Sequence, residues 1–174
     1  MPNALASGRP FPITQVDRNG GGQITLGQPE AGDWQLIFVY RGIHCPICRD
    51  YLTALEPKLA EFAGMGIEVV TVSADTAAKA HKLASDLSLT VPVGYGLTIE
   101  QMTSLGLYIS DPRSPQETDR PFAEPGLFLI NPEGNLHMVD ISNAPFLRPE
   151  LGPLPGRIKY VLDNDYPIRG THGA

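Results

Sequence analysis

The sequence has few cysteines, no long hydrophobic run and no cluster of basic residues, and each shortage excludes a class of protein. Apolar stretches are short, with 35–40 a typical case, whereas a membrane helix needs roughly 20 apolar residues. The net charge is −6 and the 13 Lys and Arg residues are scattered along the chain. The sequence therefore does not indicate a basic surface that could bind the phosphate backbone of a nucleic acid. We therefore expect neither a membrane nor nucleic acid as a partner.

The N-terminus also lacks the features of a secretory signal. Residues 1–9 contain neither a basic segment nor an apolar core, which predicts a cytoplasmic protein. Apolar residues make up 42% of 174 residues, which is enough for the core of one domain. The 17 prolines and 18 glycines predict many turns and some long connections.

The two cysteines, Cys45 and Cys48, are only three residues apart. A disulfide between them would close a tiny loop and would stabilise the fold little, because the entropic gain grows with loop length. A zinc site needs four ligands, and the four histidines lack the usual spacing of metal ligands. The pair therefore indicates a redox-active dithiol that needs no metal and no cofactor.

Apolar periodicity predicts an alternation of strands and helices. Strands are expected at 23–26, 35–40, 67–73, 92–95, 126–130 and 136–141, the last two forming a hairpin. Helices are expected from Pro46 to about residue 63, with a kink at Pro57, and at 76–87, 99–105 and 154–162.

This order predicts an α/β protein with a thioredoxin-like, three-layer fold: a mixed central sheet with helices on both faces. We expect residues 1–22 to form a loose N-terminal arm, 23–165 the thioredoxin-like domain, and 166–174 a C-terminal tail. Residues 110–124, which are polar and contain three prolines, are expected to form a long surface excursion.

The position of the dithiol predicts different roles for its two sulfurs. Cys45 stands immediately before the first helical residue, Pro46, where unpaired N–H groups and the helix dipole favour a thiolate. Such a position lowers a cysteine pKa from about 8.5 to between about 3.5 and 7.5. Cys48 lies one turn further into the helix and is expected to be less ionised. We therefore expect Cys45 to attack the substrate and Cys48 to resolve the intermediate as a disulfide.

Three other residues are candidates for supporting roles. Arg41 and His44 precede Cys45 and could add positive charge beside its thiolate, or could simply be a surface arginine and a histidine that points elsewhere. Pro125 precedes the strand expected at 126–130. A cis bond there would present backbone to a disulfide substrate, although trans is the commoner form.

The segment 38–49, FVYRGIHCPICR, resembles the signature of the peroxiredoxin-like branch of the alkyl hydroperoxide reductase/thiol-specific antioxidant (AhpC/TSA) group. The resemblance continues through 127–134, LFLINPEG, and through the tail segment 163–170, DNDYPIRG. It implies a thioredoxin fold in which Cys45 is the peroxidatic or nucleophilic cysteine.

The chain departs from the typical pattern P-x-x-x-[TS]-x-x-C of that group. Gly42 stands at the Thr/Ser position and Phe38 at the Pro position, so the hydroxyl that would orient a peroxide is missing. Pro125 replaces an arginine of typical peroxiredoxins and is similar to the cis-proline of thioredoxins, which favours a cis bond there. Arg41 is the candidate substitute for that arginine. These departures favour thiol–disulfide exchange.

The sequence thus leaves one leading hypothesis and two alternatives. The first is an antioxidant oxidoreductase that reduces hydroperoxides through a Cys45 sulfenic acid resolved by Cys48, recycled by an external thiol of the thioredoxin or glutathione type. The second is a thiol–disulfide oxidoreductase that acts on protein disulfides with the same dithiol. The third is a non-enzymatic redox sensor or binding domain. A homodimer is a further candidate assembly.

Overall fold

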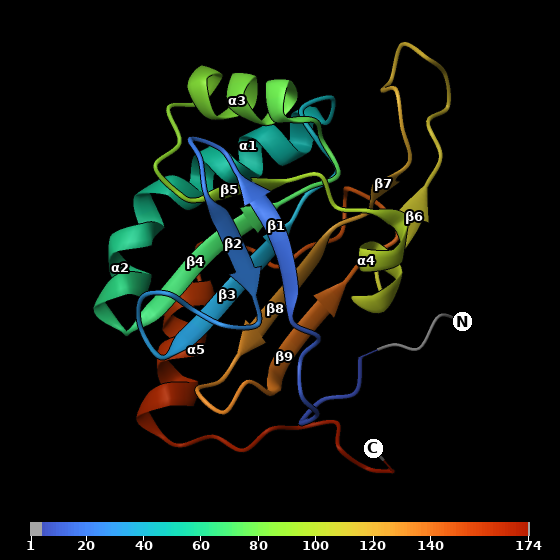
Figure 1. Cartoon of the computed structure of the whole chain (residues 1–174). Coiled ribbons are helices and arrows are strands. Elements are labelled where there is room, and N and C mark those ends of the chain that lie inside the picture. Colours follow the sequence, from blue (N-terminus) through green and yellow to red (C-terminus); the bar gives the residue numbers. More distant parts are fainter. Residues whose placement is uncertain (1–4, 174) are drawn as a thin grey trace.

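A seven-stranded mixed sheet forms the centre of the molecule (Figure 1). The computed structural model describes residues 5–173. Along the sheet the strand order is β2-β1-β5-β4-β3-β8-β9. The strands are β1 (Thr14–Arg18), β2 (Gln23–Leu26), β3 (Trp34–Val39), β4 (Ile67–Val72), β5 (Val93–Tyr95), β8 (Gly126–Ile130) and β9 (Leu136–Ile141).

The centre of the sheet is parallel and its margins are antiparallel. β3 pairs in parallel with β4, and β4 with β5. β8 runs antiparallel to β3 and forms a hairpin with β9. Parallel strands need crossover connections, and the helices supply them. The mixed sheet and the hairpin predicted from the sequence are confirmed.

Alternation along β3 divides the core into two halves. The helical elements are α1 (Pro46–Leu55), the 3-10 turn η1 (Glu56–Lys58), α2 (Leu59–Gly64), α3 (Ala77–Asp86), α4 (Ile99–Ser104) and α5 (Leu154–Asp163). Leu36 and Phe38 point into the core that the helices α1, α2, α3 and α5 cover, whereas Ile37 and Val39 point into the core on the other face. Continuous apolar runs thus mark strands buried on both sides.

Pro57 interrupts the first long helix, as expected. α1 ends at Leu55, a single 3-10 turn contains Pro57, and α2 then continues. A proline ring inside a helix removes one hydrogen bond and crowds the preceding turn. The break leaves the first turn of α1, which carries both cysteines, intact.

The N-terminal arm was predicted wrongly in part. Residues 14–18 form β1, which lies between β2 and β5 in the sheet (Figure 1). Val16 is buried there and Phe11 packs in the same core. Residues 1–4 of the expected arm, and residue 174 of the expected tail, lie outside the described residues.

The excursion at 110–124 is partly ordered as a small antiparallel ladder. β6 (Ile109–Ser110) pairs with β7 (Phe122–Ala123), and the loop between them extends away from the sheet (Figure 1). Salt bridges join this loop to Lys79 of α3 and to Arg41. The excursion therefore lies beside the start of α1.

None of the helices within residues 5–173 is long and apolar enough to cross a membrane.

Candidate active site

Cys45 is the N-cap of α1. Its backbone is extended (φ −98°, ψ 105°), and its Sγ accepts a hydrogen bond from the Cys48 N–H at 3.3 Å. Pro46, the first helical residue, needs no N–H partner. The sulfur thus replaces the oxygen that usually caps a helix and receives one of its unpaired donors. The position predicted for Cys45 is the one the structure shows.

Both cysteines are free thiols and both are buried. Cys45 is 1% exposed and Cys48 is 0% exposed. Tyr40, at the end of β3, and Leu52, one turn further along α1, belong to the same core cluster as the two sulfurs. The two thiols are therefore reduced and largely shielded from bulk solvent.

The surroundings of Cys45 stabilise its thiolate. A side-chain hydrogen bond with Cys48 is the main cause that lowers the pKa of Cys45 to about 6. Burial opposes this shift, whereas the Cys48 N–H and the Arg41 guanidinium add to it. This value lies well below the pKa of about 8.5 of an unperturbed cysteine. Cys45 is thus largely ionised at neutral pH.

Cys48 is affected in the opposite direction. Its pKa is raised well above the ordinary value, first by the hydrogen bond with Cys45 and then by burial. The charge and hydrogen bond of Arg148 act against this rise. Since one proton is shared between two sulfurs, stabilising one thiolate disfavours the other. The sulfurs therefore differ as the attacker and the resolver of a dithiol would.

Arg41 lies beside Cys45, and two carboxylates hold it there. Its Nε is 3.0 Å from Glu124 Oε2, and its Nη2 is 3.7 Å from Glu117 Oε1. The guanidinium also stacks on Phe122, 4.7 Å from the ring centroid. Arg41 is 15% exposed and Glu124 is 5% exposed, so the pair is well shielded from solvent. Glu117 and Glu124 were not singled out in the sequence.

The His44 ring packs against an aromatic side chain, although it was a candidate for adding positive charge beside Cys45. Its ring packs edge-on against Phe122, with centroids 4.7 Å apart. Burial, and after it the charge of Arg41, lower the pKa of His44, so the ring is neutral at pH 7. His44 therefore does not supply positive charge to the thiolate of Cys45.

The expectation of a cis bond before Pro125 is wrong. The Glu124–Pro125 bond is trans, as are the other bonds of the described chain. Pro125 still reaches the neighbourhood of the dithiol, because it lines a cavity of about 20 Å³ together with Tyr40, Leu52 and Arg148. A cavity of that size holds about one water molecule.

Arg148 is a site residue that the sequence did not reveal. Its Nη2 donates a hydrogen bond to Cys48 Sγ at 3.2 Å, and its guanidinium stacks on Tyr51, 4.9 Å from the ring centroid. The residue lies 100 positions after Cys48, in the irregular segment between β9 and α5. No motif or periodicity marks it.

Asp75 was also missed. It follows β4, and its Oδ2 accepts a hydrogen bond from the Ile43 N–H at 2.7 Å. This bond fixes the turn that leads from β3 into Cys45. Asp75 is buried, and this burial raises the pKa of its carboxyl group.

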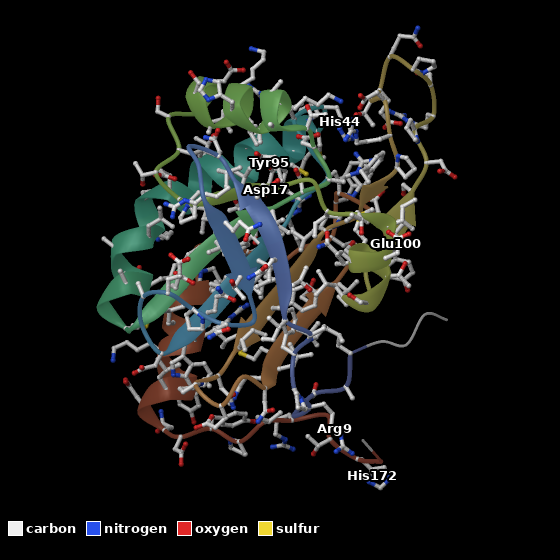
Figure 2. The ribbon with its side chains drawn as sticks, in the orientation of Figure 1. Arg9, Asp17, His44, Tyr95, Glu100 and His172 are labelled. Atoms are coloured by element: carbon white, nitrogen blue, oxygen red, sulfur yellow. The ribbon has the colours of Figure 1, made fainter. Side chains whose placement is uncertain are left out.

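The structure offers no obvious metal site in its described part. Within residues 5–173, no three His, Cys, Asp or Glu side chains converge as metal ligands do. Figure 2 shows His44 and His172 at opposite ends of the molecule.

Comparison with known proteins places this site in context. A sequence profile of the AhpC/TSA family matches residues 7–139. No curated protein sequence matches the chain significantly. Solved structures do match it over nearly its whole length, at identities that show the fold alone.

Three of these structures illustrate the likeness. A mutant of peroxiredoxin 6 from Arenicola marina has a TM-score of 0.76 at 17% identity, over 94% of this chain and 76% of that one. A peroxiredoxin-like protein from Aquifex aeolicus has a TM-score of 0.74 at 18% identity, over 91% and 88%. Peroxidoxin BcpB from Mycobacterium tuberculosis has a TM-score of 0.72 at 16% identity, over 92% and 97%.

Proposed function

Since the chain belongs to the AhpC/TSA family and is a peroxiredoxin-like, thiol-dependent oxidoreductase, we propose that it reduces hydroperoxides with Cys45 and Cys48 as its dithiol. One observation carries this assignment: the Cys45 sulfur caps α1 and has a pKa lowered to about 6, chiefly by its hydrogen bond with Cys48. A thiolate is the reactive form of cysteine, so the nucleophile is present at neutral pH without a separate base.

The reaction follows from the two unlike sulfurs. The Cys45 thiolate attacks the terminal peroxide oxygen, the O–O bond breaks, and the leaving oxygen takes up a proton as an alcohol or water. Cys45 becomes a sulfenic acid. The Cys48 sulfur then attacks Cys45 Sγ, the S–O bond breaks, and water leaves. An external thiol of the thioredoxin or glutathione type, which a reducing cytoplasm would supply, reduces the disulfide back to the dithiol.

The burial of the sulfurs favours a small electrophile over a protein disulfide. Cys45 is 1% exposed, and a protein disulfide must bring two sulfurs and their backbone into line with the attacking atom. A peroxide presents a single oxygen. The bond before Pro125 is trans, so Pro125 does not correspond to the cis-proline of thioredoxins, and that argument for disulfide exchange no longer applies. Thiol–disulfide exchange remains the alternative because it uses the same Cys45 thiolate and Cys48 resolver.

Two assays with one dithiol reductant distinguish these activities. We expect the reduced protein to consume hydrogen peroxide or an organic hydroperoxide rapidly and to reduce insulin slowly. Cys45→Ser should abolish peroxide consumption. Robust insulin reduction without peroxide turnover would reverse the assignment, and a single oxidation that no reductant reverses would support a sensor.

Mass spectrometry of Cys48→Ser identifies the electrophile directly. After peroxide, we expect one added oxygen on Cys45, which a sulfenic-acid reagent should trap. After a disulfide substrate, a mixed disulfide at Cys45 would indicate exchange instead. If Cys48→Ser lost all reactivity while Cys45→Ser kept it, the roles of the two cysteines would be the reverse of those proposed.

A further inference from the structure

The Arg148 guanidinium is a cation without a carboxylate partner, and it lies on a sulfur. Its Nη2 donates to Cys48 Sγ at 3.2 Å. Within residues 5–173, no carboxylate oxygen lies within 4.0 Å of it. Arg41, by contrast, contacts both Glu117 and Glu124. The anion that would complement Arg148 is therefore a thiolate at Cys48.

Neighbouring groups fix the position of Arg148. The Tyr51 ring lies under its guanidinium, 4.9 Å from centroid to Cζ. The Tyr51 hydroxyl donates to the backbone oxygen of Pro149, the next residue, at 2.6 Å. One side chain of α1 thus supports the guanidinium and holds the loop that carries it.

We propose that Arg148 is a catalytic residue for the resolving half of the reaction: it stabilises the Cys48 thiolate, both when this thiolate attacks the oxidised Cys45 and when it departs from the disulfide. This inference rests on the proposed function of the dithiol. It assigns the two cysteines different cations, because Arg41 lies beside Cys45 and Arg148 contacts Cys48.

The role of Arg148 changes with the oxidation state of Cys45. In the reduced protein, the main cause of the raised pKa of Cys48 is its hydrogen bond with Cys45. When Cys45 becomes a sulfenic acid, its negative charge is gone and that cause no longer applies. The cation at 3.2 Å then favours ionisation of Cys48. Cys48 thus stays protonated until its thiolate is needed.

The bond changes balance at both steps. In resolution, the Cys48 thiolate donates an electron pair to Cys45 Sγ, the S–S bond forms, the S–O bond breaks, and the oxygen leaves as hydroxide that is protonated to water. In recycling, an external thiolate attacks Cys45 Sγ, the S–S bond breaks, and Cys48 departs with the electron pair. A leaving thiolate of lower pKa departs faster, so the Arg148 hydrogen bond assists this step as well.

Titration of Cys48 tests the contact without any turnover. In a Cys45→Ser background, thiolate absorbance in the ultraviolet reports the ionisation of Cys48 alone. Adding Arg148→Met should raise the Cys48 pKa by about 1 to 3 units, and Arg148→Lys should restore part of the difference. Arg157→Met, which removes an exposed arginine of α5, is the matched control and should leave the titration unchanged.

Rapid quenching after one equivalent of hydrogen peroxide tests the role in the cycle. With Arg148→Met, Cys45 sulfenic acid should form at the wild-type rate and persist at least about tenfold longer, since each unit of rise in the Cys48 pKa lowers its thiolate fraction about tenfold. Wild-type persistence of the sulfenic acid, or an unchanged Cys48 pKa, overturns the proposal. Equal slowing of sulfenic acid formation and of its resolution would also overturn the proposal, because it would indicate a structural role for Arg148.

The two proposals can fail separately. If the wild-type protein forms no sulfenic acid with peroxide, the proposed peroxidase function fails. The Cys48 titration still decides whether Arg148 stabilises its thiolate, and the release of Cys48 from the oxidised dithiol by a small thiol can still be timed. A wild-type release rate in Arg148→Met would then reject the role of Arg148.

Discussion

The Asp75 carboxylate occupies the space where a side chain at position 42 would begin. A Cβ atom on Gly42 would lie 2.7 Å from Asp75 Oδ1 and 2.9 Å from His44 Nδ1. Gly42 also has φ +143°, which strongly favours glycine. The hydroxyl that typical peroxiredoxins carry at this position cannot be accommodated without moving the carboxylate that holds the Ile43 N–H.

Gly42→Thr should therefore destabilise the protein rather than restore a missing group. We expect a loss of about 1–3 kcal/mol in the free energy of unfolding from backbone strain alone, measured by urea denaturation of the reduced protein. Gly64→Ala is the control, because Gly64 is helical and an added Cβ meets nothing within 4 Å. Stability equal to wild type, with faster peroxide reduction, would refute this explanation of Gly42.

The hydrogen bond from the Cys48 side chain should separate two substitutions of that residue. Cys48→Ser keeps a side-chain donor, so the Cys45 pKa should stay well below that of a free thiol. Cys48→Ala removes the donor that contributes most to lowering the Cys45 pKa, which should rise by about one unit or more. The pH dependence of Cys45 alkylation measures both. Identical profiles for the two variants would show that the helix end, not the donor, sets the pKa.

Arg41 and Glu124 should show coupled effects on stability. Arg41→Gln leaves a carboxylate that is 5% exposed without its cation, which should cost about 3 kcal/mol. The double variant Arg41→Gln/Glu124→Gln should recover much of that stability, because no buried carboxylate is then left without a cation. In both of these variants the Cys45 pKa should be higher than in the wild-type protein, since the Arg41 guanidinium contributes to lowering it. Denaturation and thiol titration of the four proteins of this cycle provide the test; additive stability losses would contradict it.

The stability of the reduced protein should rise between pH 6 and pH 9. The pKa of Cys45 falls from an ordinary 9.0 to about 6 on folding, so its contribution is complete above pH 9 and is lost as the pH falls through 6. The gain relative to Cys45→Ser should reach roughly 2–4 kcal/mol. Cys48, with a raised pKa, opposes stability only above pH 9. Urea denaturation of both proteins across this range measures the difference, and parallel curves would be the contrary result.

The sequence was sufficient where function follows from local chain geometry. Cys45 before Pro46, after an apolar strand, specified the helix N-cap and the thiolate. The strand at 67–73 and the helix that begins after Thr76 were predicted because apolar spacing reflects burial directly. β1 was missed because Val16 is its only large apolar residue, and pairing with β2 and β5 stabilises it instead.

The sequence was insufficient where a side chain contacts the site from a distant segment. Arg148 reaches Cys48 from an irregular loop, and Asp75 reaches Ile43 across 32 positions. Neither contact leaves a periodic pattern. His44 shows the converse limit: adjacency to Cys45 does not fix where its ring points, and packing on Phe122 decides it.

The support of Arg41 by Glu117 and Glu124, and of Cys48 by Arg148, has a consequence for protein engineering. The segment 41–49 contains the whole recognisable motif, yet these three partners come from elsewhere in the chain. A graft of that segment onto another thioredoxin-like scaffold would transfer the dithiol and the Cys48 hydrogen bond that lowers the Cys45 pKa. It would leave Arg41 without its two carboxylates and Cys48 without its cation, so the grafted motif would reproduce only part of the chemistry of this protein.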